Sequence, residues 1–158
     1  MTHENWKWKS GPVDAGRAVV FDMDGVISNA SGRQHHIENG DWDAFFESCR
    51  DDEVIHELAR LLVLLQEDLT VVLLTARPLR VQPQTLEWLE RHQLRWDLLC
   101  MRSENTIART ADYKRETVHQ LRDYGFELLI AFEDDRRNAE MFHSEGIPCV
   151  YIHSGYYE

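Results

Sequence analysis

Hydrophobic residues along this chain fall into short apolar runs that alternate with amphipathic stretches. Runs bounded by Gly, Pro or charged residues predict five buried strands, which are residues 19–22, 69–74, 96–101, 128–132 and 148–152. Amphipathic stretches predict helices over residues 54–66, 85–92, 112–124 and 138–145. Because strands and helices alternate, we expect an α/β fold with a five-stranded, mostly parallel sheet covered by helices on both faces.

Two segments lie outside this alternation. Residues 1–16 are a polar lead-in, in which Trp6 and Trp8 are expected to pack against the edge of the sheet. Residues 28–52 read as a flap-like loop with one short helix near residues 43–49, which is too small for a full lid domain. The length of 158 residues fits a single domain spanning residues 1–158.

Composition narrows the range of partners and compartments. The chain has 28 acidic and 17 basic residues, and its formal charge of -11 argues against broad binding to duplex nucleic acid or anionic membranes. Its three cysteines are far apart and an odd number, which indicates reduced thiols rather than disulfides. The N-terminus lacks the apolar core of a signal peptide, and no run approaches the roughly 20 apolar residues of a membrane span. We therefore expect a soluble, cytoplasmic protein.

Candidate chemistry gathers where the predicted strands end. Four polar clusters follow a strand or open a helix: Asp22 with Asp24, Thr75 with Arg77, Lys114, and Asp134 with Asp135. Taken singly, each also suits an ordinary helix cap, a solvated charge or an acidic turn. Because ligands in open α/β sheets bind beyond the carboxyl ends of the strands, the four clusters together predict one site at one edge of the sheet.

The order of these clusters resembles the four motifs of the haloacid dehalogenase (HAD)-like phosphatase superfamily. They stand as Phe21-Asp22-Met23-Asp24-Gly25-Val26, Leu73-Leu74-Thr75-Ala76-Arg77, Lys114, and Phe132-Glu133-Asp134-Asp135. The resemblance implies a Rossmann-like three-layer sandwich with no cap or a minimal one.

Within this superfamily the chain is similar to the 3′-phosphatase domains of bacteriophage T4-type polynucleotide kinase-phosphatases. The shared features are Asn29-Ala30-Ser31-Gly32-Arg33, Arg102 and Arg109 ahead of Asp112-Tyr113-Lys114, Asp134-Asp135-Arg136 leading to Glu140-Met141-Phe142, Gly146-Ile147, and Ser154-Gly155. The sequence contains no Gly-x-x-x-x-Gly-Lys-Ser/Thr phosphate loop, so the resemblance extends to the phosphatase activity and not to the kinase. It also implies nucleic acid repair as the context, with a separate kinase or ligase as partner.

The residue types themselves fit the hydrolysis of phosphate monoesters. Asp22 is the expected nucleophile, which forms an aspartyl-phosphate, and Asp24 is the expected general acid and then base. Mg²⁺, which prefers oxygen ligands, is expected on Asp22, the backbone carbonyl of Asp24, and Asp134 or Asp135. Phosphoryl oxygens are expected to bind two further side chains, those of Thr75 and Lys114, and Lys114 also keeps Asp22 ionised.

The substrate follows from the small flap and from the arginines. A site without a large cap stays open to the end of a polymer, and a small basic rim is expected from Arg33, Arg77, Arg102 and Arg109. We therefore expect the 3′-phosphate end of a nucleotide or of a short single strand to be preferred. Trp42 could stack on a base, but packing with Phe45 and Phe46 in the core is favoured.

Two other functions share parts of this pattern. The first is a phosphatase that uses the same site on a sugar phosphate or a free nucleotide. The second is a receiver-type signalling module phosphorylated on Asp22, which is disfavoured because the receiver's acidic pair lies a whole βα unit before its phosphorylated Asp. His35 and His36 suggest zinc only weakly, since neither cysteine nor carboxylate spacing accompanies them, and they are expected to be solvated or to face substrate.

Overall fold

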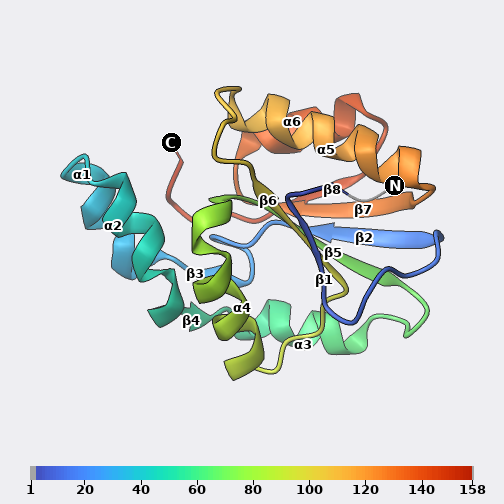
Figure 1. The fold of residues 1–158 in the computed structure, drawn as a ribbon, viewed down its shortest axis with the longest axis horizontal. Coiled ribbons are helices and arrows are strands. Elements are labelled where there is room, and N and C mark those ends of the chain that lie inside the picture. Colours follow the sequence, from blue (N-terminus) through green and yellow to red (C-terminus); the bar gives the residue numbers. More distant parts are fainter. Residues whose placement is uncertain (1–2, 158) are drawn as a thin grey trace.

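The protein has an α/β fold built around one mostly parallel sheet, as a computed structural model that describes residues 3–157 shows (Figure 1). Over these residues the sheet has six strands in the order β1-β6-β5-β2-β7-β8. Their bounds are β1 Trp6–Trp8, β2 Arg17–Phe21, β5 Thr70–Pro78, β6 Leu98–Arg102, β7 Glu127–Glu133 and β8 Cys149–Tyr151. The four longer helices are α3 His56–Leu64, α4 Gln82–Arg91, α5 Thr110–Tyr124 and α6 Arg136–Ser144.

The prediction of a five-stranded sheet was wrong by one strand, because the polar lead-in supplies β1. This strand pairs antiparallel with β6 and places Trp6 opposite Cys100. Its three residues, Trp-Lys-Trp, are too few to show an alternating pattern that sequence reasoning could separate from a loop. The expected packing of the two tryptophans at the sheet edge is confirmed, since both lie in the edge strand β1 opposite β6, where their rings also contact the ring of Tyr124 on α5.

Strand β2 lies inside the sheet, between β5 and β7 and parallel to both. Its side chains alternate between the two faces, so that Val19 and Phe21 join one core and Ala18 and Val20 join the other. The first core lies under α3 and α4, and the second lies under α5 and α6 (Figure 1). Burial on both faces explains why this strand is apolar at every position after Arg17.

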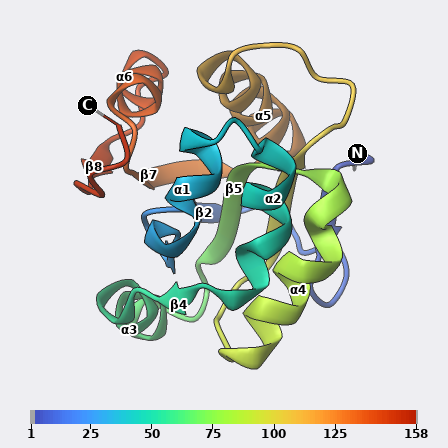
Figure 2. The same ribbon diagram turned by 90° about the vertical axis from the view of Figure 1, so that its left-hand side faces the viewer.

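The flap, residues 28–52, is anchored at its base by a separate two-stranded sheet. In that sheet β3 (Ser28–Asn29) pairs antiparallel with β4 (Glu53–Val54). Between these strands lie α1 (Gln34–Glu38) and α2 (Trp42–Glu47), which stand over one end of the main sheet beside α4 (Figure 2). The short helix expected near residues 43–49 is confirmed as α2, whereas α1 was not predicted.

Three sequence-level expectations about single segments can be compared with the structure. Strand β5 continues to Pro78, beyond its predicted end at residue 74, so Thr75 and Arg77 are strand residues. The three cysteines are free thiols, with Cys49 and Cys100 buried and Cys149 partly buried. Within residues 3–157, no helix has the length and apolar character that crossing a membrane requires.

Candidate active site

The first candidate residue, Asp22, directly follows β2 and is buried at the carboxyl edge of the sheet. Met23 is buried in the core. Gly25 then has a positive φ of 82°, a backbone conformation that residues other than glycine rarely adopt. A Cβ atom at Gly25 would lie 2.1 Å from Oδ2 of Asp134. Gly25 is therefore required for Asp134 to approach the turn that carries Asp22 and Asp24.

Lys114 holds two carboxylates at this edge. Its Nζ atom donates to Oδ1 of Asp22 at 2.9 Å and to Oε2 of Glu133 at 2.8 Å, and all three side chains are buried. Both carboxylates raise the pKa of the Lys114 ammonium, although burial opposes this, so Lys114 is a cation in the folded protein. Lys114 of α5 thus contacts side chains at the carboxyl ends of two strands, β2 and β7.

Asp22, Glu133 and Asp134 form an acidic cluster that could hold a metal ion. One oxygen from each of these buried carboxylates lies within 4.8 Å of the others. Ser154 donates to Oδ2 of Asp134 at 2.6 Å, while Oδ1 of Asp134 is buried without a hydrogen-bond partner among the described residues. Burial, the charge of Glu133 and the neighbouring Asp134 raise the pKa of Asp22, and burial raises the pKa of Asp134 to about 7. A hard divalent cation would relieve this crowding and satisfy the unpaired oxygen.

Glu133 was missing from the predicted site residues, although it is the last residue of β7. The rule that strand ends carry site residues could have identified it, but the run Glu133-Asp134-Asp135 hides which two carboxylates face the site. The structure places Asp135 outside the acidic cluster. Asp135 caps the N-terminus of α6, where its Oδ1 accepts from the backbone N–H of Arg137 at 2.9 Å.

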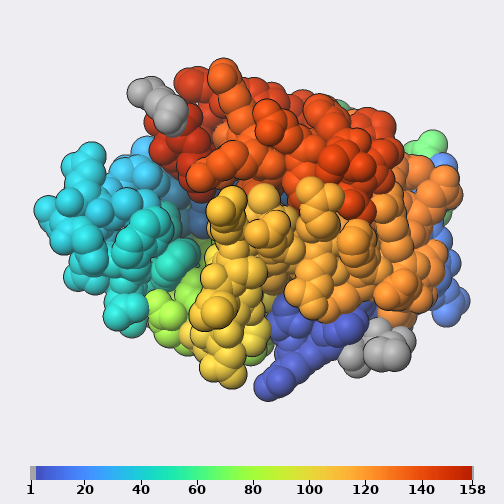
Figure 3. All heavy atoms as spheres, turned by 90° about the horizontal axis from the view of Figure 1, so that it is seen from above, coloured from blue at the N-terminus to red at the C-terminus, as the bar shows by residue number. Residues whose placement is uncertain are grey.

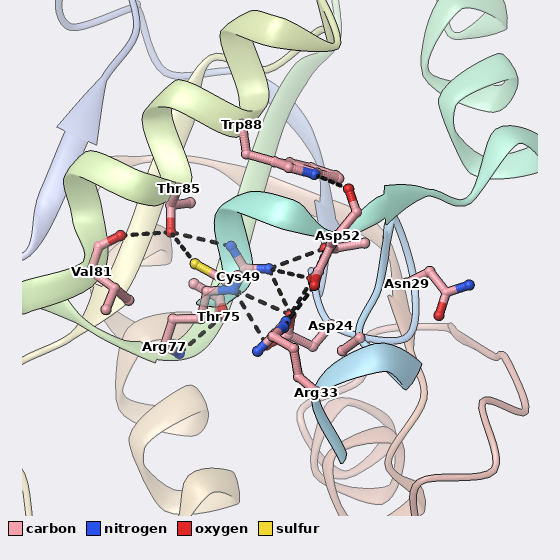
Figure 4. A network of polar contacts seen from close by, with 12 residues as sticks. Asp24, Asn29, Arg33, Cys49, Asp52, Thr75, Arg77, Val81, Thr85 and Trp88 are labelled. Carbon is pink, nitrogen blue, oxygen red and sulfur yellow. Dashed lines mark hydrogen bonds and ion pairs between the residues drawn. The ribbon is translucent and has the colours of Figure 1, made fainter. Parts of the chain in front are cut away.

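Asp24 faces the opposite side of the turn, toward two buried arginines (Figure 4). Its Oδ1 accepts from the Nη2 atoms of Arg33 at 2.8 Å and of Arg77 at 2.7 Å. These guanidinium groups hold the pKa of Asp24 well below its usual range, even though burial acts in the other direction. In the ligand-free protein, Asp24 is a carboxylate.

The same arginines are tied to a second carboxylate, Asp52, at the end of the flap (Figure 4). Arg33 donates to both carboxylate oxygens of Asp52, from Nε to Oδ1 at 2.7 Å and from Nη2 to Oδ2 at 2.6 Å. Its Nη1 donates to the backbone carbonyl of Phe45. The backbone carbonyl of Asp52 accepts from the indole N–H of Trp88 at 2.8 Å. The predicted substrate-binding residues Arg33 and Arg77 are thus buried and already engaged, which links the flap to Asp24.

Thr75 lies beside this network on β5 and is fully buried. Its hydroxyl oxygen accepts from the backbone N–H of Arg77 at 3.1 Å, and its carbonyl accepts from the hydroxyl of Tyr113. Of the predicted site residues, the structure therefore gathers Asp22 and Asp24 just after β2, Thr75 on the neighbouring strand β5, and Lys114 on α5.

A pocket of about 610 Å³ opens beside Asp24, between the flap, the loop after β6 and the C-terminal segment. These three segments surround one end of the molecule in Figure 3, where the flap is cyan, the loop yellow and the C-terminal segment red. The pocket is lined by Asp24, Gln34, Ile37, Trp42, Phe45, Phe46, Ala76, Arg77, Pro78, Arg80, Arg102, Ser103, Glu104, Thr106, Thr110, Asp135, Arg137, Tyr156 and Tyr157.

The pocket changes the interpretation of several predicted residues. The prediction that Trp42 packs in the core was wrong. Its ring contacts Phe45 and Phe46 as expected, but 52% of the residue is exposed and it lines the pocket. Arg102 lines the pocket, whereas Arg109 is exposed and is not among the lining residues.

The two histidines of the flap lie side by side on α1. Their ring centroids are 3.9 Å apart, and His35 is exposed while His36 is half-buried. Neither is among the residues that line the pocket beside Asp24, and neither belongs to the acidic cluster.

Comparison with known proteins agrees with this geometry. Residues 16–157 match the family described as the phosphatase domain of the polynucleotide kinase PNKP. The chain belongs to this family. It is a HAD-type phosphatase, in the class of phosphoric monoester hydrolases. Among curated protein sequences, none matches the chain.

Solved structures show the same fold in related and more distant proteins. Two structures of a Pnkp1/Rnl/Hen1 complex, one described as an RNA repair complex, contain a similar chain with a TM-score of 0.76 and 22% or 21% identity. They align with 93% and 96% of this chain, which spans about half the length of theirs, 50% and 47%. A class C acid phosphatase from Bacillus anthracis, with tungstate bound, aligns over 94% of this chain and 70% of its own, with a TM-score of 0.57 and 15% identity. At these identities the likeness establishes the fold alone.

Proposed function

We propose that this PNKP-family phosphatase is a Mg²⁺-dependent phosphomonoesterase that removes the 3′-phosphate from nucleotides or polynucleotide ends through an aspartyl-phosphate. The observation that carries the proposal is the arrangement around one turn. Asp22 lies between Lys114 and an acidic cluster, and two residues later Asp24 enters a pocket of small-molecule size.

In the first step, an oxygen of Asp22 attacks phosphorus while the bond from phosphorus to the leaving oxygen breaks. Asp24 gives that oxygen a proton, so the product leaves as an alcohol. Lys114 pairs with Asp22, which lowers the pKa of that carboxyl against the effect of burial, and with Thr75 it stabilises charge on the phosphoryl oxygens. In the second step, Asp24 takes a proton from water, which attacks phosphorus, breaks the acyl-phosphate bond and releases inorganic phosphate.

The residues that would hold Mg²⁺ are Asp22, Glu133 and Asp134, with the backbone carbonyl of Asp24 from the sequence-based expectation. A divalent cation there supplies positive charge that lets an anionic carboxylate approach an anionic phosphate. The buried Oδ1 of Asp134, which has no hydrogen-bond partner within residues 3–157, supports this assignment. Asp135 is left as the helix cap of α6.

The raised pKa of Asp134 makes stability depend on pH in a defined direction. Asp134 binds its proton more tightly in the folded protein than in the unfolded chain, where its pKa is near 3.8. The protonated carboxyl therefore stabilises the fold at low pH, and this contribution is lost as pH rises through about 7. Since Mg²⁺ replaces the proton, we expect the rise in Tm on adding MgCl₂ to be larger at about pH 8 than at about pH 6. Thermal melts of the protein and of Asp134→Asn measure this.

The Tm of the Asp134→Asn variant should respond little to MgCl₂ at either pH. The asparagine side chain carries no negative charge for the metal ion and has no proton that the metal ion could displace. Asp14→Asn, at an exposed position on the lead-in, is the matched control and should behave like the parent protein. A Mg²⁺ response that persists unchanged in Asp134→Asn would contradict the assignment of Asp134 as a ligand.

Asp24 must alternate between two protonation states. Its ion pairs with Arg33 and Arg77 suit the carboxylate form, which acts as the base toward water in the second step. A phosphate dianion bound next to Asp24 favours uptake of the proton that the first step uses, because like charges raise the pKa of a carboxyl group. We infer that the two arginines position Asp24, since their donors already reach it.

The preference for nucleotide or polynucleotide 3′ ends draws support from three observations. The family is named for polynucleotide kinase, and a chain of similar fold occurs in a complex described as a Pnkp1/Rnl/Hen1 RNA repair complex. The flap is small, with two short α-helices, and leaves the pocket open at the surface. The pocket is also lined both by an arginine, Arg102, and by the aromatic residues of the flap. By the same reasoning, a protein of the kind found with Pnkp1 in that complex is a candidate partner.

The test is a phosphatase screen with Mg²⁺ over matched substrates. We expect kcat/KM for a 3′-phosphorylated oligonucleotide or nucleoside 3′-monophosphate to exceed that for the 5′-phosphorylated isomer and for sugar phosphates by at least about tenfold. Affinity for the oligonucleotide should depend shallowly on salt, because few backbone phosphates are contacted. Equal kcat/KM values for sugar phosphates would replace the polynucleotide assignment with a small-molecule phosphatase that uses the same site.

A further inference from the structure

We propose that the aromatic face of the flap, formed by Trp42 and Phe46 on α2, is a subsite for the base of the terminal nucleotide. The proposal rests on the proposed function, because it places that nucleotide's 3′-phosphate at Asp22. It adds a base-binding surface and a chemical class of ligand, a planar and uncharged heteroaromatic ring.

Trp42 is an exposed residue that is nevertheless held in place. Its ring centroid lies 5.8 Å from that of Phe45, edge-on, and 6.0 Å from that of Phe46, while 52% of the residue remains exposed. Phe45 is 6% exposed and anchors the cluster in the protein. The aromatic neighbours thus fix the indole from one side and leave surface free on the pocket side, where a base can stack.

The helix that carries Trp42 is tied across the pocket. The guanidinium of Arg80 forms ion pairs with Asp43 on α2 at 2.7 Å and with Glu104 in the loop after β6 at 3.4 Å. The same guanidinium lies 5.9 Å from the centroid of Phe46. These surface ion pairs join the flap to the opposite wall and add to the aromatic packing that holds Trp42, which favours an aromatic face positioned before a ligand arrives.

Charge in the pocket favours an uncharged ring beside the phosphate over a second anionic group. Four arginines line the pocket, and three of them have carboxylate partners: Arg77 with Asp24, Arg80 with Asp43 and Glu104, and Arg137 with Asp135. The fourth, Arg102, has no carboxylate partner among the described residues and donates to the carbonyl of Ala108. The pocket therefore offers little unpaired positive charge beyond Arg102, and its flap side is largely apolar and aromatic, with Ile37, Trp42, Phe45 and Phe46.

The size of the pocket agrees with one nucleotide. Its volume of about 610 Å³ lies within the range of about 300–1,000 Å³ typical of small-molecule sites. The lining includes Asp24, which follows the proposed nucleophile by two residues, and Trp42 and Ile37 of the flap. We therefore assign the recognition of one base to the flap, with further nucleotides of a strand outside the pocket.

The kinetic test compares two substrates that differ only in the base, a deoxynucleoside 3′-monophosphate and the corresponding abasic deoxyribose 3′-phosphate. Trp42→Ala should raise KM for the nucleotide about tenfold more than KM for the abasic compound, because one base-stacking contact is lost. Trp42→Leu keeps apolar bulk without a π-face and should act like Trp42→Ala. Trp42→Phe keeps a π-face and should recover most of the affinity.

A binding measurement gives a readout that does not depend on turnover. In the Asp22→Asn background, a nucleoside 3′-monophosphate should quench tryptophan fluorescence, the abasic compound should not, and Trp42→Phe should abolish the quenching. Leu64→Ala, an exposed apolar change on α3, is the control and should leave both measurements unchanged.

The outcomes separate the subsite from the function. If the parent protein prefers the nucleotide but the Trp42 variants raise KM equally for both substrates, the subsite is overturned and the 3′-phosphatase proposal stands. The subsite is likewise overturned if Trp42→Leu behaves like Trp42→Phe. If the parent protein itself does not distinguish the nucleotide from a sugar phosphate, the proposed function fails, and the subsite fails with it.

Discussion

Asp22→Asn is expected to lower kcat by about 10³-fold or more on every phosphate monoester, since the amide cannot attack phosphorus. The fold should survive this change. Asp22 shares a crowded cluster with Glu133 and Asp134, and its pKa is raised by burial and by those neighbours. Removing one negative charge relieves repulsion, so we expect the Tm of the metal-free variant at about pH 8 to equal or exceed that of the parent protein.

The controls for this prediction use both kinetics and thermal melts. Asp14→Asn introduces the same chemical change at an exposed position and should retain full activity. Parent protein in excess chelator should lose activity as Asp22→Asn does. Full turnover by Asp22→Asn, or full turnover by the parent protein in chelator, would rule out the proposed mechanism.

Asp24→Asn is expected to separate substrates by the leaving group. A ribose hydroxyl is a poor leaving group that needs a proton, so we expect a loss of about 10²- to 10⁴-fold on a nucleoside 3′-monophosphate. An aryl phosphate needs less protonation, and we expect its hydrolysis to fall by less than about tenfold in the bond-breaking step. Single-turnover measurements of that step avoid the later water attack, which also uses Asp24.

Asp24→Asn also removes a charged partner from Arg33 and Arg77, which are buried. Loss of one partner of a buried ion pair costs about 3–5 kcal/mol, and Asp52 offsets part of this because it still pairs with both arginines. The ratio of the two single-turnover rates, taken on one preparation, is independent of how much protein is folded. Equal losses on both substrates would mean that Asp24 organises the site and does not transfer the proton.

Much of the fold could be predicted because its signals are local. The apolar run of β2 and the amphipathic α5 are long enough to show their periodicity, and parallel strands place their carboxyl ends at one edge. That edge is where the structure brings Asp22, Thr75 and Lys114 together. By contrast, β1 has three residues, and its pairing with β6 depends on a segment more than ninety positions away in the chain.

Side-chain direction could not be predicted in the same way. The sequence shows three neighbouring acidic residues, Glu133-Asp134-Asp135. The direction in which the chain leaves β7 determines that Glu133 and Asp134 lie beside Asp22, while Asp135 caps α6. Arg33 was expected to belong to a small basic rim that binds the substrate. Its burial results from Asp52, nineteen positions later, which meets it only after β3 and β4 pair.

The exposure of Trp42 illustrates the opposite error. An aromatic cluster usually forms a core, and Phe45 does so, but a helix as short as α2 cannot bury aromatic residues on more than one face. One tryptophan therefore remains at the surface, and the fold sets it over the pocket.

The central claim, that Asp22 carries the phosphoryl group, is tested most directly by trapping the intermediate. The protein is mixed with a 3′-phosphorylated oligonucleotide and Mg²⁺, quenched in acid within the first turnover, digested and examined by mass spectrometry. We predict a phosphoryl group on Asp22, absent from Asp22→Asn and accumulating in Asp24→Asn with an aryl phosphate, where water attack is slowed. Rapid turnover with no phosphorylated peptide, or with the phosphoryl group on a different residue, would contradict the account.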